Sequence, residues 1–198
     1  MILGTSLQRL LIPIYRTTIR KDADIMENPF RPAEKYPAPL IAITLVFSFI
    51  AIALLALIDQ NVYIEGCRSQ FIVASLGSTA VLIYAVPKAP FSKPKNVFFG
   101  HIFSAIFAIT VAIIFDMAGQ LQDLNWICCG ICVAGSILIM MMTGTIHPPA
   151  GATALACAIS MITDYQFVIF PIAIGLLVMM AIAYGANYCK DKYVPEQE

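Results

Sequence analysis

The chain has 198 residues, of which 60% are hydrophobic and 12% are charged, whereas soluble domains average about 45–50% and about 25%. This composition excludes an ordinary soluble globule and favours a protein embedded in a lipid bilayer. The 12 basic and 12 acidic residues cancel, so the net charge gives no argument for nucleic acid binding. We therefore expect the lipid bilayer as a partner and no nucleic acid.

Residues 1–39 are predicted to form an N-terminal amphipathic, cytoplasmic segment that ends in a linker. Residues 1–37 hold ten of the 24 charged residues, and apolar residues recur at helical spacing near the start of the chain. This pattern is typical of a helix that lies in the membrane interface. Four prolines between residues 29 and 39 then disfavour helix, because each restricts the residue before it to extended conformations.

Six apolar segments follow, and they predict an all-α polytopic membrane protein with six transmembrane helices. The fifth segment is the shortest, because its 16 residues reach about 24 Å across a hydrocarbon core of about 30 Å. A half-helix is therefore the alternative for this segment. The transmembrane domain covers residues 40–188, and residues 189–198 form a C-terminal tail. The six segments are residues 40–58, 69–86, 97–117, 124–142, 148–163 and 166–188.

The placement of basic residues predicts the orientation of the chain. With six spans, eleven of the 12 Lys and Arg residues fall on one side of the membrane, and only Arg68 falls on the other. Basic residues are enriched in the cytoplasmic loops of membrane proteins. We therefore expect an integral protein of the cell membrane, or an equivalent membrane, with both termini cytoplasmic.

A short internal match suggests a repeat. Gly77 to Val81 in the second segment resembles Gly151 to Leu155 in the fifth, 74 residues later. If the match reflects duplication rather than chance, residues 40–117 and 124–188 form a 3+3 inverted repeat, because three helices per half place the second half upside down in the membrane. In such folds the middle helices often begin inside the protein, where their N-termini attract anions.

The residues of these two segments suit a pathway for a small anion. Glycine allows a ligand or a neighbouring helix to approach closely, hydroxyl groups donate hydrogen bonds, and consecutive prolines fit a helix start. The alternative is that these small residues only pack membrane helices together. The candidate pathway residues of the two segments are Ser75, Gly77, Ser78, Thr79, Pro148, Pro149, Gly151 and Thr153.

The block Thr143-Gly-Thr-Ile-His-Pro-Pro-Ala-Gly-Ala-Thr-Ala-Leu155 contains the His-Pro-Pro signature of the HPP family of integral membrane proteins. The chain resembles a member of this family over residues 40–188, with further matches at Leu76 to Leu82 and at Gly100-His101. It departs from the family pattern at Thr143-Gly144-Thr145, where many relatives are basic. The resemblance implies a compact helical membrane domain. It also implies nitrite as the leading substrate, because some plant and cyanobacterial members are nitrite transporters.

The two histidines, His101 and His147, complete the candidate site. Both fall at the cytoplasmic ends of their predicted helices, so we expect them to approach each other. Together with Lys88, Lys93 and Lys95 in the adjoining loop, they would form a positive mouth that attracts anions. The alternative is that the lysines only reach for lipid headgroups and that His147 caps its helix.

We expect no catalytic residue, metal ligand or cofactor. The sequence holds no nucleophile motif or phosphate loop. A Cys-x-x-Cys pattern, Cys129 to Cys132, lies in an apolar run without a neighbouring histidine or acid, so metal binding there is disfavoured.

The sequence favours a membrane transporter or channel for a small monovalent anion, with nitrite as the leading candidate. The anion would be held at helix N-termini near the Gly-Ser-Thr-Ala and His-Pro-Pro motifs. One alternative is a membrane scaffold or regulatory subunit that transports nothing, and an intramembrane enzyme that uses His147 ranks last. A homo-oligomer is expected because the predicted bundle is small.

Overall fold

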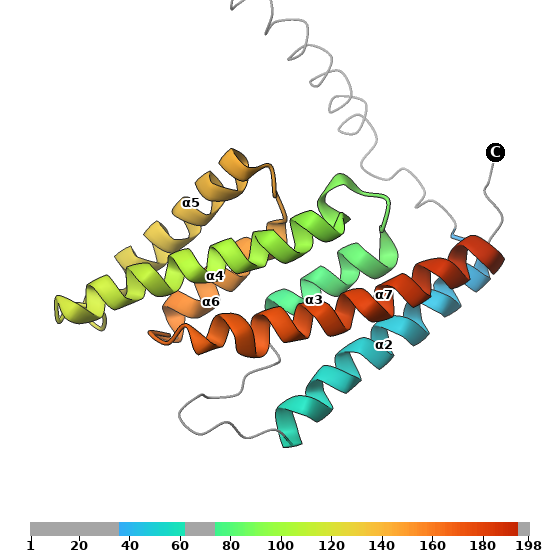
Figure 1. The fold of residues 1–198 in the computed structure, drawn as a ribbon, viewed down its shortest axis with the longest axis horizontal. Coiled ribbons are helices and arrows are strands. Elements are labelled where there is room, and N and C mark those ends of the chain that lie inside the picture. The colour runs from blue at the N-terminus through green and yellow to red at the C-terminus, as the bar shows by residue number, and fades with distance from the viewer. Residues whose placement is uncertain (1–35, 62–73, 194–198) are drawn as a thin grey trace, which may run out of the picture. The chain divides into compact units, whose positions relative to one another are not determined.

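The structure is a computed structural model that describes residues 36–61 and 74–193. The predicted N-terminal segment, residues 1–39, lies outside this part of the chain except for residues 36–39, of which Ala38 and Pro39 are helical, and residues 194–198 of the predicted tail also lie outside. Figure 1 shows the helices in chain order. They are α2 (Ala38–Asn61), α3 (Ala74–Ala80), the π-helical turn η1 (Val81–Ala85), the 3-10 turn η2 (Pro90–Ser92), α4 (Pro94–Met117), α5 (Asn125–Thr143), α6 (Pro148–Ile159), the π-helical turn η3 (Val168–Ala173) and α7 (Ile174–Tyr193).

The described residues form helices and connections only, which confirms the all-α membrane fold. Each of the six predicted segments contains a helix, but the lengths differ. Four helices in the described ranges are long and apolar enough to cross a bilayer, namely α2, α4, α5 and the helix Val168–Tyr193, which is kinked at Phe170. The helices Ala74–Ala85 and Pro148–Ile159 are shorter. Their 12 residues rise only about 18 Å, against a hydrocarbon core of about 30 Å.

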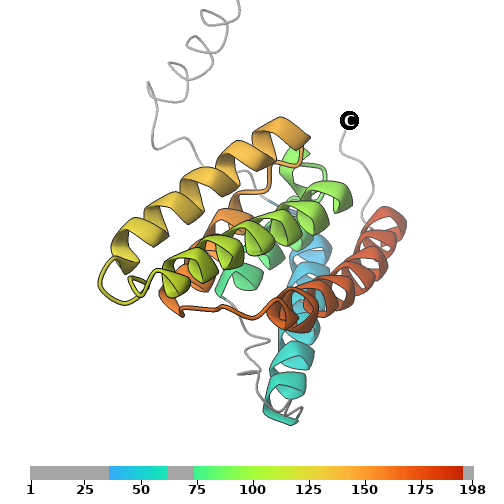
Figure 2. The same cartoon turned by 60° about the vertical axis from the view of Figure 1, so that its left-hand side comes forward.

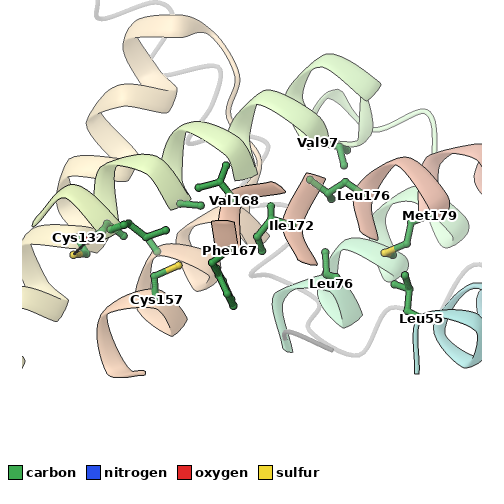
Figure 3. Packing of buried hydrophobic residues seen from close by; sticks show 14 of the residues in the cluster. Leu55, Leu76, Val97, Cys132, Cys157, Phe167, Val168, Ile172, Leu176 and Met179 are labelled. Carbon is green, nitrogen blue, oxygen red and sulfur yellow. Dashed lines mark hydrogen bonds between the residues drawn. The ribbon is translucent and has the colours of Figure 1, made fainter. Parts of the chain in front are cut away.

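Helix α4 contacts helices from the second half of the chain, and α7 joins them to α2. In Figures 1 and 2, α4 lies against α5, α6 and the η3–α7 helix, while α2 packs along α7. Figure 3 shows Leu76 of α3 directed toward α7, near Leu176. The close approach depends on Gly175 of α7, where an added Cβ would lie 3.3 Å from Leu76 Cδ1 and 3.8 Å from Leu55 Cδ2. Small residues promote such contacts in lipid, where van der Waals packing drives helix association.

Two helix ends and two connections lie together at one end of the bundle. The Tyr84 carbonyl accepts hydrogen bonds from Thr44 of α2, at 3.3 Å, and from the buried Lys190 of α7. Asn96 of α4 donates to the Ile146 carbonyl at 3.1 Å. The start of α2, the η1–α4 connection, the α5–α6 connection and the end of α7 therefore share one end. These are the segments that the charge pattern assigns to one side of the membrane, and the identity of that side stays a prediction.

Two glycines fix the path of the α5–α6 connection. Gly144 has the left-handed conformation, with φ 62° and ψ 36°, and its N–H donates to the Met140 carbonyl to end α5. The chain then passes over α4 at Gly100. An added Cβ on Gly100 would lie 3.0 Å from both His147 Cβ and the Thr145 carbonyl oxygen. Gly100 therefore lets the residues before α6 lie directly on α4.

We predict that Gly100→Ala lowers the stability of the protein in detergent by about 1–3 kcal/mol, because the new methyl group meets backbone that cannot move aside without separating α4 from α6. Thermal unfolding measured by fluorescence or circular dichroism checks this. Gly130→Ala is the matched control, since nothing lies within 4 Å of its added Cβ. Equal melting temperatures for the two variants would contradict the close approach at Gly100.

Candidate functional site

Five polar side chains meet inside the bundle, although they come from distant parts of the sequence. Two belong to α3, one to α4, one to the connection before α6 and one to α6 itself. All are buried, with 1% or less of their surface exposed. We call them the polar cluster, which consists of Ser75, Thr79, His101, His147 and Thr153.

Thr79 is the centre of the polar cluster. Its Oγ1 lies 2.8 Å from His101 Nε2 and 3.1 Å from His147 Nε2. The same oxygen lies 2.9 Å from the backbone carbonyl of Ser75, one turn earlier in α3. The two imidazole rings have centroids 5.0 Å apart. One hydroxyl group therefore joins both histidines to α3.

The polar cluster continues from His101 to α6 and back to α3. His101 Nδ1 lies 2.6 Å from Thr153 Oγ1, which in turn lies 2.7 Å from Ser75 Oγ. Ser75 thus pairs with Thr153, while Thr79 pairs with His147. Thr79, the later residue of α3, contacts His147 just before α6, whereas the earlier Ser75 contacts Thr153 within α6. The two short helices therefore run antiparallel where they cross.

A backbone carbonyl sets the proton positions when both rings are neutral. His147 Nδ1 lies 2.8 Å from the Phe91 carbonyl, which can only accept, so Nδ1 carries the hydrogen of the neutral His147 ring. The Thr79 hydroxyl donates to the Ser75 carbonyl. Thr153 donates to Ser75 Oγ, so the Thr153 oxygen accepts from His101 Nδ1. Both neutral histidines are therefore expected to carry their hydrogen on Nδ1.

Ser104 adds an unpaired buried hydroxyl beside the polar cluster. It lies on α4, one turn beyond Gly100 and therefore on the same helix face, which packs against α6. The residue is fully buried, and its Oγ has no hydrogen-bond partner among the described residues. Unsatisfied buried hydroxyls are uncommon because they cost free energy. Ser104 can therefore donate to a bound water or ligand without losing an existing bond.

Other candidate residues lie outside the polar cluster. Gly77 is two residues from both Ser75 and Thr79, and Gly151 is two residues from Thr153, which places each glycine on the opposite face of its helix. An added Cβ at either glycine would have no described atom within 4 Å. Ser78 donates to the Ser75 carbonyl at 2.9 Å and is exposed. Sequence reasoning had placed both glycines beside a ligand or a neighbouring helix.

The two glycines instead line separate apolar grooves. Gly77 lies in a groove of about 580 Å³ between α2 and α3. Gly151 lies in a groove of about 570 Å³ between α5 and α6, together with the exposed Pro148. Pro149, in contrast, is buried at the start of α6. Each groove is thus formed by the first and second helices of a predicted half.

The predicted positive mouth is only partly assembled. Both histidines are buried, whereas Lys88 and Lys93, on the connection that also carries Phe91, and Lys95, in the first turn of α4, are exposed. The lysines therefore lie along the segment that contacts His147 through the Phe91 carbonyl. In the described ranges, no group of three or more His, Cys, Asp or Glu side chains is arranged to hold a metal ion.

Sequence reasoning missed three parts of the site. The Phe91 carbonyl belongs to the backbone and leaves no signal in the residue types. Ser104 lies within a long apolar helix, where its spacing from Gly100 was the only available hint. Gly100 formed part of the family resemblance, but its packing role depends on the path of the α5–α6 connection.

Comparison with known proteins gives the relationships of the chain. Residues 34–195 match the family model described as "HPP, transmembrane region". Two curated transmembrane proteins of Dictyostelium discoideum are similar, one 34% identical over 150 residues and the other 37% identical over 145 residues. The alignments cover 73% and 71% of this chain but 50% and 45% of those proteins, so the chain spans about half their length. No solved structure matches the chain.

We predict that Thr153→Val destabilises the protein by about 1–3 kcal/mol, because His101 Nδ1 and Ser75 Oγ would both lose a buried partner. Thr153→Ser keeps the hydroxyl and should recover most of the loss. Melting temperatures in detergent provide the measurement. Thr110→Val, which removes a hydroxyl bonded to Tyr165 outside the polar cluster, should have a smaller effect. A Thr153→Val protein as stable as the wild type would contradict the hydrogen-bond assignment.

Proposed function

The chain belongs to the family of the HPP transmembrane region, and on that premise we propose that it is a transporter or channel for a small monovalent anion, with nitrite as the leading candidate. The substrate is expected to pass at the polar cluster. This proposal assigns no enzymatic activity.

The observation that carries the proposal is the burial of two histidines and three hydroxyl side chains inside a membrane domain. Polar and ionisable groups are expensive at membrane depth and commonly mark substrate or ion pathways. Apolar residues of similar size would pack helices at lower cost. A pathway for a solute explains why these groups lie together at the crossing of α3, α4 and α6.

The chemistry of the polar cluster favours an anion over a cation. Imidazole and hydroxyl groups donate hydrogen bonds, and the spare hydroxyl of Ser104 adds a donor. The hydrogen bonds described for the polar cluster involve no carboxylate. The exposed Lys88, Lys93 and Lys95 lie on the adjoining connection and at the start of α4, where positive charge raises the local concentration of anions.

The arrangement of the short helices is compatible with the inverted repeat, which is part of this proposal. Helices α3 and α6 cross antiparallel at the polar cluster, as equivalent helices of two inverted halves would. Gly77 and Gly151 occupy corresponding positions in two similar grooves. The sequence match between residues 77–81 and 151–155 aligns the same two glycines.

We predict protein-dependent uptake of nitrite, nitrate, formate or chloride in proteoliposomes tested under both a voltage and a pH gradient. His147→Gln should lower this uptake by about tenfold or more, as expected when a hydrogen bond worth about 1.4 kcal/mol is lost along the pathway. Protein-free liposomes measure leakage of the neutral acid. Thr110→Val is the matched control and should transport like the wild type.

Each variant is tested only as a monodisperse protein below its melting temperature, so that loss of flux is separated from loss of folding. Absence of flux for all four anions under both gradients would remove the transport proposal. Normal flux in a folded His147→Gln protein would move the pathway away from the polar cluster.

The two apolar grooves favour a second candidate function, a scaffold that assembles with itself or with another membrane helix. The two grooves have about equal volumes and are lined mainly by apolar residues. The exposed Gly77 lines one groove and the exposed Pro148 lines the other. Small residues allow close helix association in lipid. This candidate predicts that the polar cluster can be altered without loss of a cellular phenotype.

We predict that Gly151→Leu lowers the assembly state if copies join through the α5–α6 groove, because the larger side chain fills the groove. The single chain should still fold, since an added Cβ at this position meets no described atom within 4 Å. Light scattering in detergent measures the mass. Gly130→Leu is the control, because Gly130 of α5 is also uncrowded. An unchanged mass for Gly151→Leu would exclude this groove as the interface.

A further inference from the structure

We propose that the groove between α2 and α3 holds an acyl chain of one anionic phospholipid, whose phosphate is bound by Lys190 at the end of this groove. We call it the α2–α3 groove. The inference goes beyond the proposed transport and does not depend on it. It rests on the length of the groove, on the hydroxyl groups at one of its ends and on a buried ammonium group beside them.

The length of the α2–α3 groove matches one leaflet of a bilayer. Its lining runs from Thr44 to Ala56 on α2 and from Gly77 to Ala85 on α3 and η1, and its volume is about 580 Å³. Twelve residues of helix rise about 18 Å, against about 15 Å for half of the hydrocarbon core. A spanning helix of a second copy would need about twice this length. The groove therefore fits an acyl chain of one leaflet better than a membrane helix.

The polar groups of the α2–α3 groove are gathered at one end. Thr44 and Ser48 lie one turn apart near the start of α2. Tyr84 also lines the groove, but its hydroxyl donates to the Met179 carbonyl of α7 at 2.8 Å. The start of α2 lies beside the end of α7 (Figure 1). A polar end followed by an apolar length corresponds to the headgroup and the chain of a phospholipid.

A buried lysine places a positive charge at this polar end. Lys190 of α7 is only 6% exposed, and its ammonium group donates to the Tyr84 carbonyl. The same carbonyl accepts from the groove residue Thr44 at 3.3 Å. The ammonium group and the Thr44 hydroxyl therefore contact one oxygen at the end of the groove. Lysines near the ends of membrane helices usually extend toward the headgroups, whereas Lys190 is directed to a carbonyl of the bundle.

The charge of Lys190 lacks a negative partner in the part of the chain that the structure describes. Its acceptor there is the neutral Tyr84 carbonyl, and no carboxylate of the described residues forms an ion pair with it. A buried charge without an opposite charge is costly. A lipid phosphate at the end of the groove supplies the opposite charge, and the ammonium group has two further hydrogens to donate to it. Basic pockets between membrane helices bind anionic headgroups in this way.

Asn187 adds an acceptor for a hydroxyl group of the lipid headgroup. It lies three residues before Lys190 on α7, so the two side chains share one helix face. Its Oδ1 is buried and has no hydrogen-bond partner among the described residues. Phosphatidylglycerol offers both groups, because its headgroup carries a phosphate for Lys190 and hydroxyl groups for Asn187. It is therefore the probe for the tests below.

The first test compares two lipids on the wild-type protein and depends on no variant. The full chain in detergent is mixed with phosphatidylglycerol or with phosphatidylcholine of the same acyl chains, and native mass spectrometry counts the lipids retained per chain. We expect one retained phosphatidylglycerol, preferred about fivefold, as for one lysine beside an anionic headgroup. Glycerol phosphate, which has no acyl chain, should not displace it.

The second test removes the charge and the groove separately. Lys190→Gln should abolish the preference for phosphatidylglycerol, whereas Lys190→Arg should keep it. Lys192→Gln is the matched control, since it removes an exposed charge from the same last turn of α7. Gly77→Leu should lower the retention of both lipids by filling the groove, and an added Cβ there meets no described atom within 4 Å. Its control is Gly151→Leu, which fills the α5–α6 groove instead.

The outcomes decide the site independently of transport. Equal retention of the two lipids by the wild type, or displacement by glycerol phosphate, would overturn the binding of an anionic phospholipid. Unchanged retention in a folded Gly77→Leu protein would overturn the groove, and so would a fall from dimer to monomer mass without a change in bound lipid. Loss of the preference in a folded Lys190→Gln protein, but not in Lys192→Gln, supports the proposal. Absence of anion flux would remove the proposed function and leave this inference standing.

Discussion

A single hydroxyl group, that of Thr79, contacts both imidazole rings and the backbone of its own helix. Within a membrane domain, lipid offers no hydrogen bonds to a polar side chain, so each buried group must find its partners in the protein. Three helices meet this requirement together, because α3 supplies the hydroxyl, α4 supplies His101 and α6 supplies Thr153. The positions of these helices and the protonation of their side chains are therefore linked.

The backbone prepares this meeting at a few positions. The left-handed Gly144 ends α5, and Gly100 allows the following residues to lie on α4, which brings His147 next to His101. The two short helices, Ala74–Ala85 and Pro148–Ile159, are part of the same arrangement. A 12-residue helix cannot cross the hydrocarbon core alone, and both short helices contribute buried side chains to the polar cluster.

Much of the fold could be predicted because long apolar runs locate membrane helices to within a few residues, and all six segments contain one. The Gly-Ser-Thr-Ala and His-Pro-Pro motifs also contain Thr79, His147 and Thr153, and the sequence outside these motifs named Ser75 and His101. The register between α3 and α6 could not be predicted, since it depends on packing. Gly77 and Gly151 lie on the helix faces opposite Ser75 and Thr153 and line two apolar grooves, and their part in a pathway stays a prediction.

The most direct test is the tautomeric state of the two histidines, measured by nitrogen-15 NMR of the histidine-labelled protein in detergent or lipid at neutral or slightly alkaline pH. The hydrogen bonds to Thr153 and to the Phe91 carbonyl predict the same neutral tautomer for both rings, with the hydrogen on Nδ1. Spectra of His101→Asn and His147→Asn proteins assign the two signals. A hydrogen on Nε2 of either neutral ring, or two rings that each exchange rapidly between both forms as in water, would contradict the polar cluster as described.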